Sequence, residues 1–442
     1  MIRYVKLKNY RSLVDLYVDL TNKRGTPKKL VLVYGENGVG KSNFAYAFYT
    51  LSEILRTKSV KDIVEHILEE NAEERNYEED LSLKKFIRER FKDIEGIIKE
   101  SKTIGSFGEN MVLEFGIKID GRNGVYRLET DDRQIVYERL EYIISKEKKV
   151  FYEITQDKVV LDENLVKREE YLEELENLIN QYWGKHSLLS LLVSENEDKK
   201  EGYVEERISK YLYKVMAYFM TMSIRLKASL SVEKGKMGIS HPILARLDEG
   251  TLSVEKEVEL DKAESFLNEF FTHLYSDVKQ VYYDRELEDS KIKYRLIFKK
   301  KIYDKLIDIG FKEESTGTQY LLQMLPFFMA SVEGRTSIVD EMDTGIHDVL
   351  IDTILENLYE SIEGQMIITT HNTMLLESDL PKDSIYVFDV DNCSRKELLP
   401  INSFEKRIHP NLNVRKRYLQ GMYGGVPIPM SVDFEELLEI IE

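Results

Sequence analysis

The spacing of apolar residues changes several times along the chain and predicts the order of its elements. Residues 1–20 alternate apolar and polar side chains, which predicts two strands around a turn at 9–12. A short apolar run at 29–34 predicts a buried strand, and the apolar positions of 43–51 predict a helix packed on a sheet. From 109 to 162 the period is again two, which predicts consecutive antiparallel strands.

Helical spacing dominates two further stretches. Residues 53–101 are charge-dense and predict a pair of amphipathic helices, and residues 164–230 predict a longer helical region. In the last third, apolar strands alternate with helices, which favours a largely parallel sheet. The strands expected there are 337–341, 365–371 and 384–390.

These elements predict an α/β fold with a mixed sheet and an antiparallel β subdomain. We expect this discontinuous domain to comprise residues 1–163 and 276–442, with an inserted helical subdomain at 164–275. A chain of 442 residues exceeds one ordinary hydrophobic core, which agrees with such an insertion.

Composition narrows the classes of function. The net charge of −17 argues against a nonspecific nucleic-acid coat, although a local basic patch stays possible. The single cysteine, Cys393, allows no internal disulfide framework and fits a reducing cytosol. The N-terminus lacks the apolar core of a signal peptide, and no run approaches the roughly 20 apolar residues that span a bilayer. We therefore expect a cytoplasmic protein without a membrane partner.

The motif Gly-Glu-Asn-Gly-Val-Gly-Lys-Ser at 35–42 lies between a predicted strand and a predicted helix. That context is typical of a phosphate-binding P-loop, in which backbone N–H groups and the helix N-terminus face the phosphates. Lys41 would hold the β- and γ-phosphates, and the Ser42 hydroxyl would bind Mg²⁺. The residues expected to bind the nucleotide are Gly35, Asn37, Gly38, Gly40, Lys41 and Ser42.

Later residues supply the other groups that an NTPase needs. Asp340 and Glu341 end an apolar strand, where Asp340 can hold the hydration shell of Mg²⁺ and Glu341 can polarise an attacking water. Residues 315–319, Ser-Thr-Gly-Thr-Gln, open a helix and form a second anion-binding loop. His371 ends the next buried strand, where a side chain points into the ligand crevice of an open α/β sheet.

In this order the motifs resemble those of the ABC-type P-loop ATPases, in the branch that includes RecF-like, SMC-like and OLD-family proteins. The resemblance implies that two copies sandwich ATP and Mg²⁺, with Ser315 and Gly317 of one copy closing on the γ-phosphate held by the other. It also implies that Asp343 communicates between the sites and that His371 acts as the switch histidine. The sequence departs from the family at Thr318, which replaces a glycine of the signature loop.

The family's Q-loop glutamine has two candidates in this sequence. Gln134 and Gln156 both stand within the predicted antiparallel strands, and the pattern does not separate them.

A closer resemblance is to the stand-alone ATPases of bacterial phage-defence operons, the AbiL/RloA-like group related to the PARIS ATPase. It is carried by residues 8–12, 340–347 and 415–427, Arg-Lys-Arg-Tyr-Leu-Gln-Gly-Met-Tyr-Gly-Gly-Val-Pro in the last case. The resemblance implies an RloB-like or Toprim-like effector nuclease encoded nearby. The Asp-Val-Asp at 389–391 is interpreted as a strand end of the ATPase sheet, because too few residues follow for a Toprim fold.

The leading hypothesis is a Mg²⁺-dependent ATPase that acts as sensor or scaffold of an anti-phage, abortive-infection system, as a homodimer or higher homo-oligomer. One alternative is a RecF/SMC-like DNA-maintenance ATPase, which predicts steep salt-dependent DNA binding. The basic triplet Arg415-Lys416-Arg417 could contact such a nucleic acid or an acidic partner. Another alternative is a scaffold stabilised by ATP, with negligible turnover.

Overall fold

A seven-stranded, mostly parallel sheet forms the centre of the molecule in the part of the chain that is described. The computed structural model describes residues 1–69, 91–144, 147–227, 233–238, 246–391, 394–405, 412–426 and 431–441. Cys393, on which the expectation of a reducing compartment depends, lies outside these residues. The strand order is β10 (Glu233–Lys236), β9 (Ser223–Lys227), β15 (Thr336–Val339), β16 (Gln365–Thr369), β3 (Leu30–Tyr34), β17 (Ile385–Val390) and β18 (Lys396–Pro400).

The five inner strands run parallel, and β10 and β18 pair antiparallel at the two edges. This sheet confirms the predicted alternation of strands and helices in the last third of the chain. It also contains 385–390, so the Asp-Val-Asp at 389–391 lies at the end of a strand of the central sheet, as expected.

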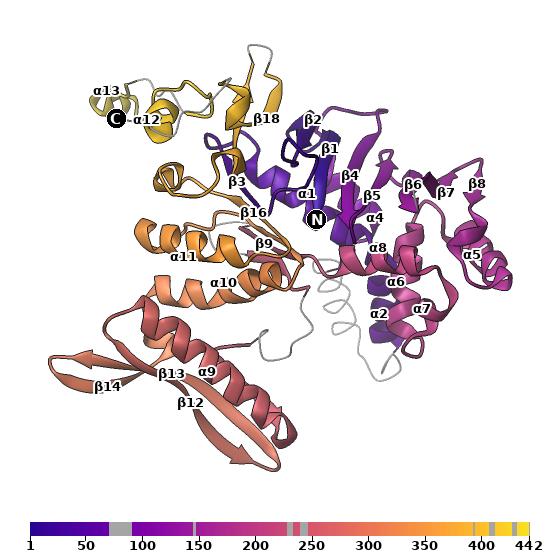
Figure 1. The fold of residues 1–442 in the computed structure, drawn as a ribbon. Coiled ribbons are helices and arrows are strands. Elements are labelled where there is room, and N and C mark those ends of the chain that lie inside the picture. The colour runs from indigo at the N-terminus through magenta and orange to yellow at the C-terminus, as the bar shows by residue number, and fades with distance from the viewer. Residues whose placement is uncertain are drawn as a thin grey trace.

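A second seven-stranded sheet is entirely antiparallel and confirms the predicted β subdomain (Figure 1). The first two strands are the predicted N-terminal hairpin, and the other five are consecutive, as the period-two pattern indicates. Its order is β2 (Leu13–Asp19), β1 (Ile2–Tyr10), β4 (Met111–Ile119), β5 (Arg122–Thr130), β6 (Ile135–Ile144), β7 (Glu147–Thr155) and β8 (Val159–Leu161).

A third sheet forms a projecting arm with the long helix α9 (Glu257–Leu274) lying along it (Figure 1). Its strands are β11 (Glu249–Ser253), β12 (Val278–Glu288), β13 (Lys291–Ile302) and β14 (Lys305–Gly310). Aromatic contacts such as Phe271 with Phe298, 4.9 Å between ring centroids, hold the helix on the sheet.

The remaining helices cover the sheets. They are α1 (Lys41–Ile54), α2 (Thr57–Glu69), α4 (Ile94–Ser101), α5 (Glu169–Tyr182), α6 (Leu188–Asp198), α7 (Tyr203–Arg207), α8 (Lys210–Met220), α10 (Thr316–Val332), α11 (Asp348–Ser361), α12 (Val414–Leu419) and α13 (Phe434–Ile441). Short 3₁₀ helices are η1 (Glu163–Leu165), η2 (Val254–Lys256), η3 (Phe311–Glu313), η4 (Thr373–Leu376), η5 (Lys382–Ser384) and η6 (Ile401–Ser403).

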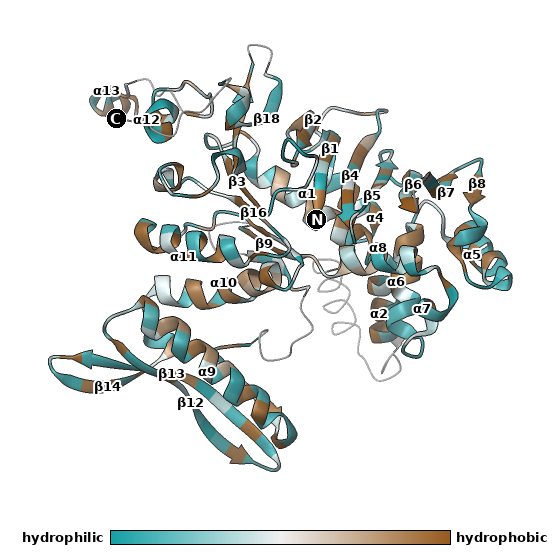
Figure 2. Ribbon diagram, in the orientation of Figure 1, coloured by the Kyte–Doolittle hydropathy of each residue, from teal (hydrophilic) through white to brown (hydrophobic). Residues whose placement is uncertain are grey.

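The parallel sheet separates two hydrophobic cores, which explains why its inner strand β3, Leu-Val-Leu-Val-Tyr, is apolar at every position (Figure 2). On one face, Val31 and Val33 pack with α1 and the antiparallel sheet. On the other, Leu30 and Leu32 pack with α10 and α11. Helix α1, which follows the P-loop, is therefore clamped between two sheets.

The prediction of a helical subdomain at 164–275 is wrong in its second part, because strands β9, β10 and β11 lie there. Helices α5 to α8 fill its first part, but β9 pairs with β15 in the central sheet, and β11 belongs to the arm. The five residues of β9 are too few to show a period, and their partner lies more than 100 residues away in sequence. Pairing with β15 therefore decided the structure of this segment.

One buried amide ties the N-terminal strand β1 to the central sheet. Gln365 is fully buried; its Oε1 accepts from the backbone N–H of Ile2 (2.7 Å), and its Nε2 donates to the carbonyls of Ile2 and Lys28 (3.0 Å each). The Gln365 side chain thus provides hydrogen-bond partners for three backbone groups, the N–H and carbonyl of Ile2 and the carbonyl of Lys28.

We expect Gln365→Leu to lower the free energy of unfolding by about 2–4 kcal/mol, because it leaves buried backbone groups without partners. Urea unfolding followed by circular dichroism measures this loss. The exposed Gln280 of β12 provides a control, since Gln280→Leu should change stability by less than about 0.5 kcal/mol. Equal stability of the two variants would contradict the structural role of Gln365.

Candidate ATP site

The predicted P-loop follows the buried strand β3 and leads into α1, the context that phosphate binding requires. Two of its glycines are sterically required. A Cβ on Gly40, whose φ is +125°, would lie 2.8 Å from the side chain of Leu13. A Cβ on Gly35, whose φ is +152°, would lie 2.8 Å from Val39 and 3.0 Å from Phe388. Gly38 also has a positive φ, +79°, while Asn37 and Gly38 are exposed at the tip of the loop.

Lys41 is buried at the first position of α1, and its ammonium lies under the loop. Its Nζ donates to the carbonyls of Gly35 (2.8 Å) and Glu36 (2.9 Å). Burial lowers the pKa of Lys41 to about 8, and the nearby carboxylates of Asp340 and Glu341 oppose this effect. The ammonium form, which binds phosphate, therefore predominates only below about pH 8.

Asp340 follows β15 and lies among hydroxyl groups. Its Oδ1 accepts from the Thr369 hydroxyl at 2.5 Å. Burial raises the pKa of Asp340, while hydrogen bonds from Thr369 and Ser42 oppose the shift. Its Oδ2 is buried without a hydrogen-bond partner. A buried oxygen that lacks a partner, next to Ser42, suits a divalent cation with oxygen ligands.

The described residues leave the rest of a Mg²⁺ site to phosphate and water. In the described part of the chain, no group of three or more His, Cys, Asp or Glu side chains could hold a metal ion by itself. Mg²⁺ is usually bound through one or two protein oxygens, substrate phosphates and water, so Ser42 and Asp340 fit this ion.

Glu341 is held in a strained backbone conformation and in an ion pair. Its φ is +49°, which is uncommon for a residue with a side chain and is typical of functional sites. Its backbone N–H donates to the Thr369 hydroxyl (2.9 Å) and its carbonyl accepts from the Tyr320 hydroxyl (3.2 Å). Its carboxylate accepts from Lys227 Nζ at 2.5 Å.

His371 follows β16, the strand between β3 and β15, and is accessible to solvent. Partial burial and the charge of Lys41 lower the pKa of His371, so the imidazole is neutral at pH 7. Its backbone N–H donates to Asp343 Oδ2 at 3.3 Å, and Asp343 Oδ1 is buried without a hydrogen-bond partner. The structure thus brings His371 and Asp343 together within one chain.

The predicted signature residues lie at the N-terminus of α10. Ser315 is the N-cap, and its exposed hydroxyl accepts from the Thr318 backbone N–H (3.2 Å). Thr318, which replaces a glycine of the family motif, is buried and joins its hydroxyl to that of Ser315 (2.9 Å). Gly317 lies against the carbonyl of Gly345, since a Cβ would approach that oxygen to 2.7 Å. The signature loop therefore contacts the segment that contains Asp343.

The arm is connected directly to this signature loop. Glu314, whose side chain is 2% exposed, pairs with Lys300 of β13 at 2.9 Å. Strand β14 leads through η3 into Ser315. A movement of the arm would therefore reach the first residues of α10.

The N-terminal hairpin supports the P-loop from one side. The Ser12 hydroxyl accepts from the Asn43 amide of α1 (2.8 Å), and the guanidinium of Arg11 lies 4.0 Å from the ring centroid of Tyr46. Together with the contact of Leu13 to Gly40, these interactions hold the turn of the hairpin against the P-loop and the first turns of α1.

The C-terminal tail supports the P-loop from another side. A Cβ on Gly425 would lie 3.2 Å from the Cα of Gly35, and Tyr418 packs edge-on against Tyr34. Two of the three basic tail residues form ion pairs within the chain, Arg415 with Glu377 (3.2 Å) and Arg417 with Glu405 (2.5 Å). These pairs favour a structural role for the triplet over contact with nucleic acid.

Sequence reasoning missed two residues that touch the site. Thr369 is one of several hydroxyl residues at a strand end, and only the position of β16 beside β15 reveals that it binds both Asp340 and Glu341. Lys227 gives no signal in the sequence, because the predicted helical region at 164–230 includes β9. Neither candidate for the Q-loop glutamine lies at the ATP site. Gln134 packs against Gly184, and Gln156 lies in the turn between β7 and β8.

Comparisons with known proteins give similarity of fold alone. No protein-family model matches the sequence, and no curated protein matches it significantly. Among solved structures, the SMC head domain from Thermotoga maritima matches with 13% identity and a TM-score of 0.38 over 90% of this chain and 98% of that one. The SMC head bound to the C-terminal winged-helix domain of ScpA matches with 14% identity and a TM-score of 0.42, over 92% and 99%.

A third match is the Smc head domain with an extended coiled coil bound to the C-terminal domain of ScpA, derived from Pyrococcus furiosus. It has 14% identity and a TM-score of 0.40 over 92% of this chain and 98% of that one. The ABC-type P-loop ATPase fold is established here by the strand order of the chain itself, with the P-loop after β3 and the carboxylates after β15.

We expect Lys41→Ala to abolish binding of Mg-ATP, because it removes the cation under the loop. Isothermal titration calorimetry measures this, with the exposed Lys29→Ala as a control that keeps wild-type affinity. In the wild type, affinity should fall as pH rises through about 8, where Lys41 loses its proton. Unchanged ATP affinity in Lys41→Ala would refute the site.

Proposed function

We propose that this protein is a Mg²⁺-dependent ATP hydrolase whose two copies close on ATP, and that the closed state controls a partner effector in phage defence. The observation that carries the catalytic part is the order β15, β16, β3 in the central sheet. It puts Asp340-Glu341, His371 and the P-loop after three adjacent parallel strands. In an open α/β sheet, the ligand crevice lies outside the carboxyl ends of such strands.

Each group has a role that its geometry supports. The P-loop N–H groups and Lys41 bind the phosphates, and Ser42 and Asp340 hold the ion. Bound Mg²⁺ would neutralise charge on the β- and γ-phosphate oxygens. Glu341 accepts a proton from the attacking water at a carboxylate oxygen, and neutral His371 donates a hydrogen bond to the γ-phosphate.

Closure by a second copy accounts for the signature loop. The Ser315 hydroxyl is exposed and stands at the N-terminus of a 17-residue helix, where an anion is favoured. In the proposed dimer, Ser315 and Gly317 of one copy bind the γ-phosphate held by Lys41 of the other. Asp343 lies between the signature loop and His371 and would report the state of one site to the other.

The defence role rests on the resemblance of residues 8–12, 340–347 and 415–427 to the AbiL/RloA-like ATPases. The contact of the tail with Gly35 supports it, because a partner that binds the tail would sense occupancy of the P-loop. The deciding observation is whether an RloB-like or Toprim-like nuclease gene lies beside this one.

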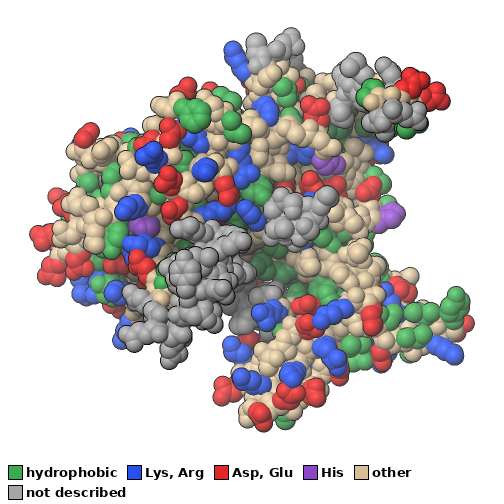
Figure 3. All heavy atoms as spheres, turned by 180° about the vertical axis from the view of Figure 1, so that it is seen from behind, with side chains coloured by type: hydrophobic (Ala, Val, Ile, Leu, Met, Phe, Trp, Pro, Cys, Tyr) green, Lys and Arg blue, Asp and Glu red, His purple; other side chains and the backbone are tan. Residues whose placement is uncertain are grey.

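A DNA clamp is less well supported by the charges. Acidic and basic side chains are interspersed over the face shown in Figure 3, and the net charge is −17. Basic residues of β13 are largely compensated, as in the pairs Lys293–Glu288 (2.5 Å) and Arg295–Asp284 (2.7 Å). DNA binding needs uncompensated cations along a groove. No helix in the described residues is long and apolar enough to cross a membrane.

One observation favours a second candidate, a scaffold in which bound ATP is structural. The carboxylate of Glu341 is engaged by Lys227, so the proposed base is not available until this ion pair opens. If the pair stays closed in the ATP-bound dimer, turnover is negligible. Steady-state release of phosphate separates the two functions.

We expect Glu341→Gln to bind Mg-ATP with wild-type affinity, to lose at least about 100-fold in kcat and to accumulate as a dimer with ATP, because the amide cannot accept the proton. Phosphate release and size-exclusion chromatography with light scattering measure these effects. Glu360→Gln, an exposed change on α11, should behave as the wild type. Parental turnover by Glu341→Gln would show that the catalytic assignment is wrong.

A further inference from the structure

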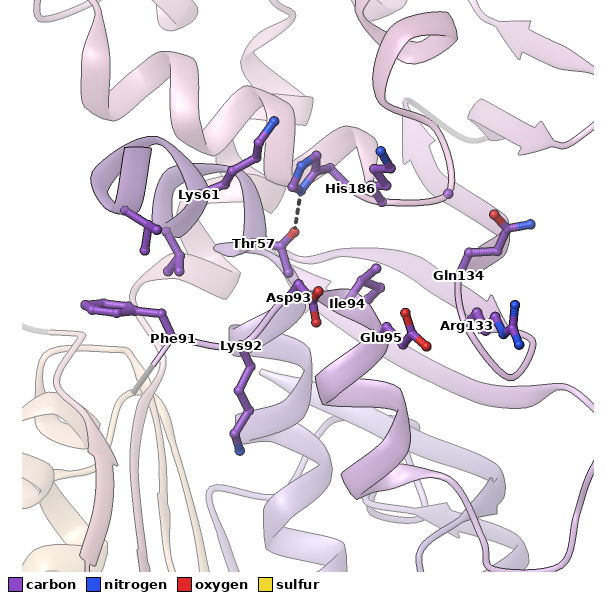
Figure 4. Close-up of a pocket in the computed structure, with 14 residues that line it drawn as sticks. Thr57, Lys61, Phe91, Lys92, Asp93, Ile94, Glu95, Arg133, Gln134 and His186 are labelled. Carbon is purple, nitrogen blue, oxygen red and sulfur yellow. Dashed lines mark hydrogen bonds between the residues drawn. The ribbon is translucent and has the colours of Figure 1, made fainter. Parts of the chain in front are cut away.

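A cavity of about 540 Å³ lies at the far end of α1 from the P-loop (Figure 4). Its wall is built from the first turns of α2, residues 91–95 at the start of α4, the β5–β6 turn and the segment before α6. Cavities of this volume are typical of small-molecule sites in proteins. The proposed ATP chemistry makes no use of it.

A histidine in this wall has a defined tautomer. Thr57 donates its one hydroxyl proton to the carbonyl of Ile54 (2.9 Å). The Thr57 oxygen must therefore accept from His186 Nδ1, 3.0 Å away, and from the Ser190 hydroxyl at 3.1 Å. Ser190 in turn accepts from the backbone N–H of Lys58 (3.0 Å). The His186 proton is thus on Nδ1, and Nε2 carries a lone pair.

His186 keeps this neutral form over the physiological range. The side chain is buried, and this burial, with the charges of Lys61 and Lys58, lowers the pKa of His186 to about 4. A neutral imidazole with an acceptor nitrogen can bind a hydroxyl or amino group of a ligand.

The wall carries an excess of positive charge in an otherwise acidic protein. Among the described residues, four cationic side chains line it against two anionic ones: Lys61, Lys92, Arg133 and Lys185 against Asp93 and Glu95. Asp93 is engaged as the N-cap of α4, where its Oδ1 accepts from Gly96 N–H at 2.9 Å.

The cations differ in how far they are compensated. Lys92 pairs with Glu100, and Lys61 with Glu65 across one helical turn at 3.4 Å, both partly exposed. Within the described residues, neither Arg133 nor Lys185 forms an ion pair. Such a wall favours a compact anion such as a phosphate group.

The wall also has an apolar part, which includes a ring and consists of Val60, Val64, Phe91 and Ile94. Phe91 lies on the same side of the cavity as Lys61, and the Gln134 amide lies near Arg133 on the other side (Figure 4). An aromatic ring can stack on a planar ligand, and a primary amide can pair with its polar edge.

We propose that this cavity binds a small phosphorylated molecule with a planar ring, of the class of nucleoside monophosphates, as a regulatory ligand. Lys61 and Lys185 bind the phosphate, Phe91 stacks on the ring, and His186 Nε2 accepts from a hydroxyl or amino group.

The ligand would act on the ATP site through α1. Thr57 binds the carbonyl of Ile54, the last residue of α1, and also binds His186. A ligand on His186 would therefore be linked, through His186 and Thr57, to the C-terminal end of the helix whose N-terminus is proposed to hold the phosphates of ATP. Because ATP binding and regulatory binding share this helix, coupling between them must be reciprocal.

Binding is tested in Lys41→Ala, in which the P-loop cannot account for it. Calorimetry uses AMP, GMP, CMP, UMP and inorganic phosphate as probes. We expect one site that binds at least one of the monophosphates with a Kd below about 1 mM, and more tightly than phosphate. Adding Lys61→Ala and Lys185→Ala should weaken binding at least about tenfold. The control pair Lys199→Ala and Lys200→Ala, on exposed residues after α6, should leave it unchanged.

Three outcomes would overturn the proposal. The first is that no probe binds at about 5 mM, which is above the range of weak specific ligands. The second is that phosphate and all the monophosphates bind equally well. The third is that the Lys61/Lys185 variant and its control bind with the same affinity. In the wild type, the bound monophosphate should also shift the Kd for ATP, and no shift would refute the coupling. None of these results depends on ATP hydrolysis, so the catalytic proposal stands or fails separately.

Discussion

The hydroxyl of Thr369 is the contact on which the geometry of the ATP site depends. It donates to Asp340 and accepts from the backbone N–H of Glu341, so one side chain fixes both carboxylate residues. Thr369 can do so because β16 lies between β3 and β15. The same strand order brings the P-loop within reach of Asp340 through Ser42. A buried carboxylate beside hydroxyl groups is stable only when its oxygens find partners, and the remaining oxygen of Asp340 still lacks one.

Supports from distant parts of the sequence converge on this centre. The N-terminal hairpin packs on Gly40, the tail packs on Gly35, and β9 brings Lys227 to Glu341. The arm reaches the signature loop through the buried Glu314. Each of these supports ends at, or directly beside, a residue proposed to bind or hydrolyse ATP. A change at the site would therefore reach the hairpin, the arm and the tail.

The sequence predicted the parts of this arrangement that local patterns encode. The P-loop, the apolar strands before Asp340 and His371, and the alternating strands of 109–162 all have short-range signatures. The role of Thr369 and the ion pair of Lys227 depend on which strands become neighbours, and no local pattern contains that information. Strand β9 shows the limit most clearly: its five residues follow α8 closely and are placed by pairing with β15.

The central claim is that each ATP site is completed by a second copy of the chain. It is tested most directly by mixing two inactive variants, Lys41→Ala and Ser315→Arg, and measuring phosphate release. A mixed dimer contains one site with an intact Lys41 from one copy and an intact Ser315 from the other. The account predicts no activity for either variant alone and recovery of about a quarter of wild-type activity in an equal mixture, from random pairing of subunits. A mixture that stays inactive, or a Ser315→Arg variant that is active alone, would contradict it.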